Sequence, residues 1–224
     1  PPLAGDASRD VLVVVGGYAG MWTAWCLTEH EPGIDIVLLE RDICGGGPSG
    51  RNGGFVNGLY DETDLLTARH GDAGRRTVEM AARSIDEIGA WCEDAGVDAW
   101  YEPSGDIGVS TNPAHDAAVR TTVAEAERLG LGNVYRPLTA DEVRARFDSP
   151  VVRTGFRVTH AATVQPGRLA RGLRNALLER GVRIFEGTLV VGFDARRPAA
   201  QTRSGTVRAG RAILGDQARR AGGH

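Results

Sequence analysis

The chain has 224 residues and a formal net charge of −3 at pH 7, and all 26 of its basic residues are arginine. This charge gives no general attraction to nucleic acid or to an anionic membrane, and no apolar run approaches the ~18 residues of a membrane-spanning helix. Because the sequence contains no lysine, a Schiff-base mechanism on this chain is excluded.

Residues 10–40 predict one β-α-β unit that is suited to holding a nucleotide. An apolar strand over 11–15 leads through a glycine-rich turn over 16–20 into an amphipathic helix, and a second strand over 34–39 ends at Glu40. Glycine lets backbone N–H groups approach a pyrophosphate, and the helix N-terminus adds a partial positive charge. Glu40 follows Gly20 at about the twenty-residue spacing of a carboxylate that bonds an adenosine ribose. The unit therefore predicts a Rossmann-like layer.

The glycine motif of this unit is incomplete. The pattern G-x-G-x-x-G places its glycines at positions 15, 17 and 20, and position 15 is valine. A β-branched residue at the tight turn is expected to strain the backbone by about 1–3 kcal/mol. Directed wholly against cofactor binding, this strain lowers affinity by about ten- to a hundredfold. The alternative interpretation is a Rossmann-like layer that holds no nucleotide.

A second glycine-rich stretch follows over residues 44–54, where six of eleven residues are glycine. Regular helices and strands disfavour this composition, so we expect a loop. Further along we expect helices over 61–95, 113–129 and 166–180, a short helix capped by Thr139 and Glu142 and ending near Phe147, and strands over 99–101, 107–110, 151–158, 182–185, 189–193 and 211–214. The order of these elements predicts an α/β protein with a mostly helical middle.

The cysteines and histidines show no metal-binding pattern. No C-x-x-C pair or zinc-type histidine spacing occurs, so we expect no metal site. Cys26 fits a predicted helix core and Cys44 lies in the glycine-rich loop, which predicts a buried thiol and an exposed one, respectively. His160 has no evident second polar partner in the sequence. Reduced thiols and the absence of a leader pattern favour a cytoplasmic protein.

Several segments together resemble one known family. They are the 10–40 unit, the loop Ser49-Gly50-Arg51-Asn52-Gly53-Gly54, and the later stretches 163–169 and 181–188. These segments are similar to the flavin-dependent oxidoreductases of the D-amino-acid oxidase superfamily, and most of all to its glycine oxidase and γ-glutamylputrescine oxidoreductase-like branch. The similarity extends from about Asp10 to Leu214. It implies a Rossmann-like FAD-binding domain with a parallel sheet, a helical insertion and the start of a substrate domain.

The resemblance also implies a set of cofactor contacts. Gly17 and Gly20 match the pyrophosphate turn, Glu40 matches the ribose carboxylate, and Val190 matches a strand residue whose backbone faces adenine. The loop residues Ser49, Gly50, Arg51, Asn52, Gly53 and Gly54 match a segment that passes the pyrophosphate and reaches the flavin ring. Small residues there let main-chain donors approach the ligand, and Arg51 can neutralise an anion.

The chemistry implied by the resemblance is oxidation of the C–N bond of a small amine or amino acid. A hydride passes to flavin N5, and the imine product hydrolyses in water. The expected partner is therefore a small-molecule amine or amino-acid substrate, without nucleic acid or membrane, and the oligomeric state stays open. No residue of the chain is assigned as a catalytic acid or base.

We expect four ranges along the chain. They are 1–60 and 151–214 in the FAD-binding domain, 61–150 as a helical insertion and the start of a substrate domain, and 215–224 as a divergent tail. Family members are about twice as long, and their strand corresponding to 211–214 continues into an A-T-G-like turn that is replaced here by Gly215-Asp216-Gln217-Ala218. We therefore expect a truncated, N-terminal portion of such an enzyme.

Two other hypotheses remain at this point. One is an inactive remnant that binds FAD weakly or not at all. The other is a stand-alone nicotinamide-binding module, because Glu40 also suits the ribose of NAD and would repel the 2′-phosphate of NADP. The loop over 49–54 argues against this module, which has no need of such a loop.

Overall fold

The computed structural model describes residues 1–215, and these form two compact units. Unit 1 contains Pro1–Gly53, Ala95–Ala99 and the segment that starts at Gln165, and unit 2 contains Gly54–Asp94 and Trp100–Val164. These units are defined by packing, so the domain ranges expected above stay a prediction. Apart from Gly215, the expected tail lies outside the described residues.

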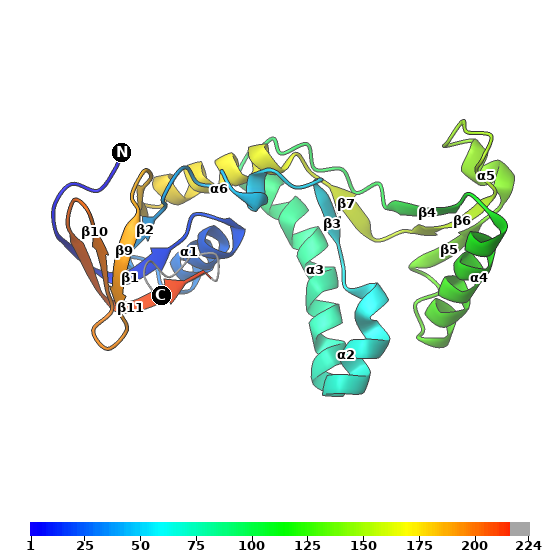
Figure 1. Cartoon of the computed structure of the whole chain (residues 1–224), viewed down its shortest axis with the longest axis horizontal. Helices are drawn as coiled ribbons and strands as arrows, with labels where there is room; N and C mark the ends of the chain where they lie inside the picture. The colour runs from blue at the N-terminus through cyan, green and yellow to red at the C-terminus, as the bar shows by residue number, and fades with distance from the viewer. Residues whose placement is uncertain (216–224) are drawn as a thin grey trace. The chain divides into compact units, whose positions relative to one another are not determined.

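Unit 1 is built on a six-stranded sheet with the order β8-β2-β1-β11-β10-β9 (Figure 1). The strands are β1 (Ala7–Val14), β2 (Ile36–Leu39), β8 (Arg183–Phe185), β9 (Val190–Asp194), β10 (Ala199–Thr202) and β11 (Thr206–Leu214). The neighbours β8, β2, β1 and β11 run parallel, whereas β10 is antiparallel to both β11 and β9. The predicted parallel sheet is therefore present, with an antiparallel extension at one edge.

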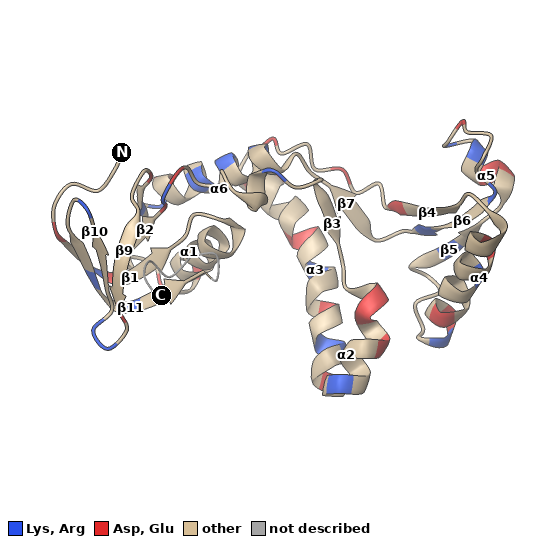
Figure 2. Ribbon diagram, viewed as in Figure 1, with Lys and Arg blue, Asp and Glu red and all other residues tan. Residues whose placement is uncertain are grey.

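Strand β2 and the second half of β1 are almost free of solvent contact. All four residues of β2 are at most 1% exposed, and Leu12 and Val13 of β1 are 0% exposed. Parallel strands of this kind are covered on both faces, which explains their continuous apolar runs. Helices α1 (Tyr18–His30) and α6 (Pro166–Glu179) belong to the same unit. Figure 2 shows basic residues spaced along α6, whose other side carries the fully buried Leu173 and Leu177.

Unit 2 contains most of the remaining helices and two small antiparallel sheets. Its helices are α2 (Thr63–His70), α3 (Asp72–Asp94), α4 (Pro113–Arg128) and α5 (Ala140–Arg144). Its sheets are β4-β6-β5, formed by Asp106–Ser110, Thr154–Val158 and Tyr135–Leu138, and β3-β7, formed by Phe55–Asn57 and Ala161–Thr163. Helix α3 lies beside α2 (Figure 1). The middle of the chain is thus helical, as expected, and also contains strands that were not expected.

Local sequence signals explain the helix boundaries. The Thr139 side chain accepts a hydrogen bond from the Glu142 N–H, and the Glu142 carboxylate accepts one from the Thr139 N–H, which confirms the predicted capping box. Pro166 occupies the first turn of α6, as predicted. Helix α3 ends at Asp94, two residues before Gly96.

The predicted strand over 99–101 is wrong. Trp100 has a φ of 53°, in the left-handed region, which interrupts an extended strand. Only Glu102 forms an isolated bridge there, with Thr163. Strands β3, β5, β7 and β10 were not expected. Each has only three or four residues, and the pairing partners of β3, β5 and β7 are distant in sequence.

Helix α6 allows a direct test of the packing in unit 1. Leu173 is 0% exposed, so Leu173→Ala should lower the free energy of unfolding by about 2–5 kcal/mol through lost burial and a residual cavity. Leu178 on the same helix is 40% exposed, and Leu178→Ala should change the free energy of unfolding little. Chemical denaturation of both variants measures the difference, and equal losses would contradict this packing.

Candidate cofactor-binding site

A cleft of about 1010 Å³ lies in unit 1 at the carboxyl ends of β1 and β2. Parallel sheets bind ligands at this edge, where strands feed into helix N-termini. Five of the residues expected to contact the cofactor line the cleft: Gly17, Glu40, Ser49, Arg51 and Val190. Residues as far apart in sequence as Gly17 and Val190 thus meet around one cavity.

The carboxylate of Glu40 is fixed at the end of β2 by two backbone amides. Its Oε2 accepts a hydrogen bond from the Gly16 N–H at 2.7 Å, and its Oε1 accepts one from the Asp42 N–H at 2.9 Å. An ionised carboxylate has about four acceptor positions. Two remain for hydroxyl donors of a ligand, which is the geometry that a ribose requires.

The N-terminus of α1 faces the same cleft. The Ser49 Oγ accepts a hydrogen bond from the Tyr18 N–H at 3.0 Å, so the second glycine-rich loop contacts the first turn of the helix. A serine hydroxyl in this position can still donate its own hydrogen. The Tyr18 hydroxyl donates to the Pro166 carbonyl at 2.8 Å and joins α1 to α6. A rotatable hydroxyl at a helix N-terminus is well placed to bind an anion.

Arg51 and Val190 both line the cleft but differ in character: one is an exposed charged residue and the other is an apolar strand residue. Arg51 is exposed, and no acidic side chain of residues 1–215 forms an ion pair with it. Its guanidinium is therefore available to an anionic ligand. Val190 is the first residue of β9, at the edge of the sheet.

The other five predicted contact residues, which are Gly20, Gly50, Asn52, Gly53 and Gly54, do not line the cleft. A Cβ at position 20 would lie 2.1 Å from the Val15 carbonyl oxygen, and one at position 50 would lie 2.2 Å from the Gly45 carbonyl oxygen. The Asn52 amide donates to the Pro48 and Ser49 carbonyls at 3.2 and 2.8 Å. Gly53 ends the first segment of unit 1, and Gly54, in unit 2, accepts a hydrogen bond from the Val164 N–H.

Val15 adopts the strained conformation expected for a non-glycine residue at this turn. Its φ is 120°, a region that side chains rarely occupy. Its side chain lines the cleft, and a Cβ at position 215 would lie 2.6 Å from its Cγ1. The valine thus places both backbone strain and side-chain volume at the edge of the candidate site.

The two cysteine predictions are wrong. Cys26 is exposed, because it lies on the outer side of α1, whereas Cys44 is 1% exposed. Burial, with the nearby carboxylates of Glu186 and Glu40, raises the pKa of the Cys44 thiol to about 12. Its sulfur lies beside the first turn, since a Cβ at position 16 would be 2.7 Å from the Sγ atom. Cys44 is therefore a packing residue.

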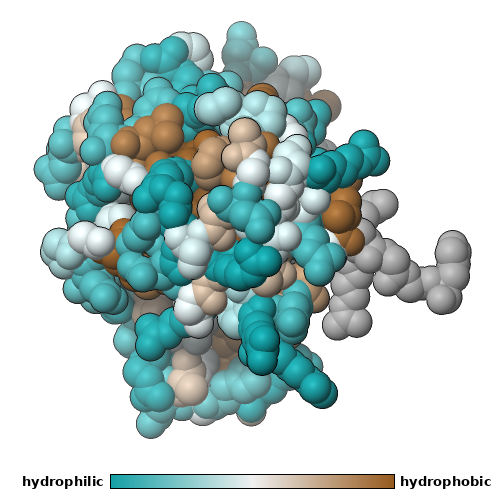
Figure 3. Space-filling view, turned by 90° about the vertical axis from the view of Figure 1, so that its left-hand side faces the viewer, coloured by the Kyte–Doolittle hydropathy of each residue, from teal (hydrophilic) through white to brown (hydrophobic). Residues whose placement is uncertain are grey.

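The sequence did not reveal the apolar wall of the cleft. Four large apolar residues that line it are 38–49% exposed: Ile43, Leu189, Val191 and Leu214. Figure 3 shows apolar patches on the face of the molecule that carries β9 and β10. Apolar side chains gathered in a cavity favour a ligand with a flat apolar part. In the sequence these residues have the pattern of ordinary strand and loop residues.

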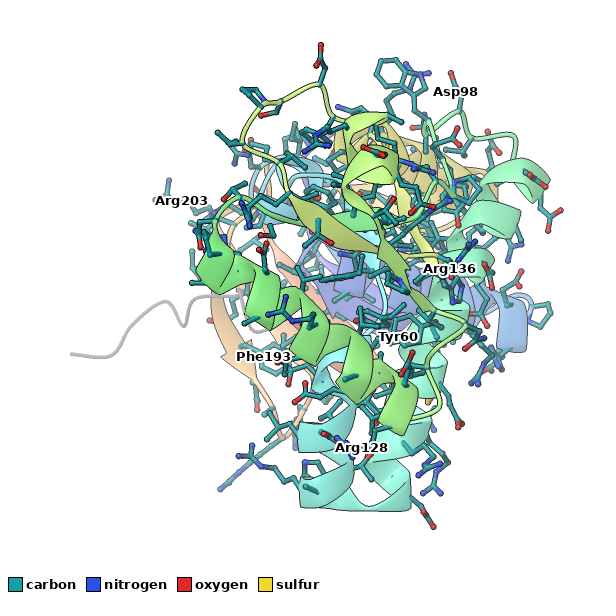
Figure 4. All side chains as sticks on the ribbon, turned by 90° about the vertical axis from the view of Figure 1, so that its right-hand side faces the viewer. Tyr60, Asp98, Arg128, Arg136, Phe193 and Arg203 are labelled. Carbon is teal, nitrogen blue, oxygen red and sulfur yellow. The ribbon has the colours of Figure 1, made fainter. Side chains whose placement is uncertain are left out.

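His160 gains two polar partners that the sequence did not indicate. Its Nδ1 atom forms a hydrogen bond with the Tyr60 hydroxyl, and its Nε2 atom lies 3.2 Å from an Asp86 carboxylate oxygen. Tyr60 packs in the core of unit 2 with Tyr135 and Ala126 (Figure 4). Burial raises the pKa of Tyr60, and the Asp86 charge adds to this effect. These contacts join three segments of unit 2.

Comparison with known proteins shows the family of the chain. The family described as FAD dependent oxidoreductase matches residues 10–215, so the chain belongs to this family, whose cofactor is FAD. The match begins at the residue where the expected resemblance begins and ends one residue beyond it. It includes both glycine-rich segments and β11.

Two curated relatives illustrate the relationship. The γ-glutamylputrescine oxidoreductase of Escherichia coli (strain K12) is 32% identical over 218 residues, which are 93% of this chain and 50% of that protein. The probable oxidoreductase OrdL of Rhizobium meliloti (strain 1021) is 28% identical over 221 residues, which are 96% of this chain and 50% of that protein. The chain thus spans about half the length of these relatives.

Solved structures show the same fold. Glycine oxidase from Geobacillus kaustophilus has a TM-score of 0.81 at 21% identity, covering 96% of this chain and 58% of that one. L-amino acid deaminase from Proteus vulgaris has a TM-score of 0.75 at 19% identity, covering 96% and 49%. Within residues 1–215 no helix is both long and apolar enough to cross a membrane, and no cluster of three or more His, Cys, Asp or Glu side chains suits a metal ion.

The cysteine environments predict selective thiol chemistry. Cys26 should react rapidly with a thiol reagent in the native protein, whereas Cys44 should react only after unfolding, because its thiol is buried and its pKa is about 12. Mass spectrometry of the alkylated native protein at mildly alkaline pH identifies the modified residue. Rapid modification of Cys44 under these conditions would contradict the packing of the first turn.

Val15 allows a test of strain at the turn. Val15→Gly should raise the affinity for FAD by about tenfold or more, because a glycine turn can adjust to the pyrophosphate without backbone strain of about 1–3 kcal/mol in the bound state. Val191 also lines the cleft but has no positive φ. Val191→Gly therefore removes a similar side chain without relieving strain and should not raise the affinity. Isothermal titration with FAD measures both, and unchanged binding by Val15→Gly would contradict the role of strain.

Proposed function

We propose that the cleft of unit 1 binds FAD and that the chain belongs to an enzyme that oxidises the C–N bond of a small amine or amino acid. One observation carries this proposal. The glycine turn, the N-terminus of α1, the Glu40 carboxylate and the Ser49 hydroxyl all line a single cleft. Membership of the FAD dependent oxidoreductase family supports it.

Each side of the cleft suits a different part of the cofactor. In the proposal, Glu40 accepts hydrogen bonds from the adenosine ribose, and the turn that contains Gly17 and Gly20 receives the pyrophosphate. The Ser49–Gly54 loop passes the pyrophosphate, and Arg51 neutralises part of its charge. The Val190 backbone faces the adenine ring, and the apolar wall that includes Val191 shields it. Glu40 would repel a 2′-phosphate, so the site disfavours NADP.

The residues also fit the size and charge of the group. A dinucleotide needs a large cleft, and the volume of about 1010 Å³ at this edge is sufficient for a long ligand. The negative Glu40 carboxylate lies at the ribose end, while the exposed Arg51 and the helix N-terminus provide positive potential for phosphates. This separation of charges argues for an adenine dinucleotide over a free phosphate.

The bound flavin would supply the redox chemistry by accepting a hydride from the C–H bond next to the substrate nitrogen. The task of the chain is to orient the cofactor and to hold its phosphates in one position. The proposed substrate class is that of similar proteins, among them γ-glutamylputrescine oxidoreductase, glycine oxidase and L-amino acid deaminase. We propose that the chain acts as part of an enzyme of this kind.

Val15 favours a second candidate function. In this candidate, the φ of 120° at the pyrophosphate turn makes the chain a weaker FAD binder than a protein with glycine at this position. In this alternative the chain keeps the fold of the family without a permanently bound cofactor. The two candidates differ in whether flavin accompanies the purified protein.

Cofactor titration tests the proposal through Arg51. The wild-type chain should bind FAD, and Arg51→Ala should weaken binding by about ten- to a hundredfold, because hydrogen bonds to charged groups contribute about 1.5–3 kcal/mol. Arg203, an exposed arginine in unit 1 that does not line the cleft, provides the matched control (Figure 4). Arg203→Ala should bind FAD like the wild type. Equal affinities of the two variants, or no binding by the wild type, would overturn the proposed site.

A further inference from the structure

The carboxylate of Glu186 lies at the meeting point of three segments of unit 1. It accepts hydrogen bonds from Arg174 at 2.7 Å and from the Cys44 N–H at 2.8 Å, and Arg171 lies at 3.4 Å. The side chains of Glu186 and Arg174 are only 15% and 16% exposed. Glu186 follows β8, both arginines are on α6, and Cys44 begins the second glycine-rich loop. One carboxylate thus connects the sheet, a helix and the loop.

Gly45, the residue after Cys44, makes further contacts that hold the start of the loop. The Gly45 N–H donates to the Gly16 carbonyl at 2.8 Å, which joins the loop to the first glycine turn. Gly45 has a φ of 73°, and a Cβ there would lie 2.4 Å from the Ala170 Cβ on α6. The loop therefore starts between the turn and α6. Four residues after Gly45, Ser49 contacts the N-terminus of α1.

A glycine-rich segment has no strong conformational preference of its own. Residues 45–47 are three consecutive glycines, and ordering them costs more backbone entropy than ordering other residues. The path from Cys44 to Ser49 is consequently defined by its hydrogen bonds to other segments, among them the bond from the Gly45 N–H to the Gly16 carbonyl. Glu186 fixes the first end through the Cys44 N–H, and Tyr18 fixes the second through the Ser49 Oγ.

We infer that Glu186 is a positioning residue for the cofactor: it holds the start of the second glycine-rich loop so that Ser49 and Arg51 meet the pyrophosphate at the N-terminus of α1. This inference rests on the proposed function of the cleft. Buried ion pairs contribute little net stability compared with apolar packing, so a geometric role is a better account of this one. No contact of Glu186 with the ligand is required.

The ionisation of Glu186 agrees with this role. Burial works to raise the pKa of Glu186, but the hydrogen bonds from Arg174 and from the Cys44 N–H outweigh it and hold the pKa below its ordinary value. The carboxylate is therefore charged at neutral pH. Because the folded pKa is depressed, the stability from this group is present above the ordinary pKa of 4.5 and is lost as the pH falls through the folded value.

Paired titrations with ADP and adenosine test the inference, because the two ligands differ by the pyrophosphate. The wild-type chain should bind ADP more tightly than adenosine. Glu186→Ala should weaken ADP binding by about tenfold, as expected for misplaced charged hydrogen bonds, and should leave adenosine binding unchanged. Glu186→Gln keeps an acceptor for the Cys44 N–H without the charge, so its preference for ADP should be intermediate.

Asp35 provides the matched control. It precedes β2, whereas Glu40 follows it, and its carboxylate accepts two hydrogen bonds of 3.0 Å from Arg183. Asp35→Ala removes an ion-paired carboxylate from the same unit at the far end of that strand. Its preference for ADP over adenosine should equal that of the wild type.

The outcomes separate the inference from the proposed function. A Glu186→Ala chain that keeps the wild-type preference for ADP, or that loses ADP and adenosine binding equally, overturns the positioning role alone. If this variant does not fold, Glu186→Gln decides by the same comparison, and an unaltered preference for ADP contradicts the inference. Wild-type chain that binds neither FAD nor ADP overturns the proposed function as well.

Discussion

Two side-chain oxygens hold consecutive parts of the first turn, and the candidate site depends on these contacts. Glu40 accepts a hydrogen bond from the Gly16 N–H, and Ser49 accepts one from the Tyr18 N–H. The acceptors come from the end of β2 and from the second glycine-rich loop, so neither segment forms the site alone. The buried strands β1 and β2 provide the fixed base. A flexible turn thus becomes a preorganised group of backbone donors.

Strain at Val15 is compatible with this arrangement because the surroundings define the turn. Backbone strain persists only where neighbouring structure fixes an unfavourable conformation. Here the second half of β1 (residues 11–14) is buried, and the glycine at position 20 leaves room for the Val15 carbonyl oxygen. Gly215, at the end of the parallel neighbour β11, leaves room for the valine side chain. The fold therefore accommodates the valine at this turn.

Sequence patterns predicted the features that depend on residues close together in the sequence. The β-α-β order, the capping box at Thr139 and the first-turn proline at position 166 are local signals, and all are present. Burial of the cysteines was predicted wrongly, because it depends on what packs against each one. Strands β3, β5 and β7 and the contact between Glu186 and Cys44 were missed, because each depends on a partner that is distant in sequence. That contact joins residues 142 positions apart, which no periodicity indicates.

Hydrogen–deuterium exchange with and without FAD tests the central claim most directly. The account predicts slower exchange on FAD binding at the backbone amides of residues 16–20 and 45–51, because the cofactor phosphates bind there and exclude water. Amides at the amino end of the same sheet, such as those around Asp35, should exchange at unchanged rates. Protection confined to unit 2, or no protection of the two glycine-rich segments at saturating FAD, would contradict the account.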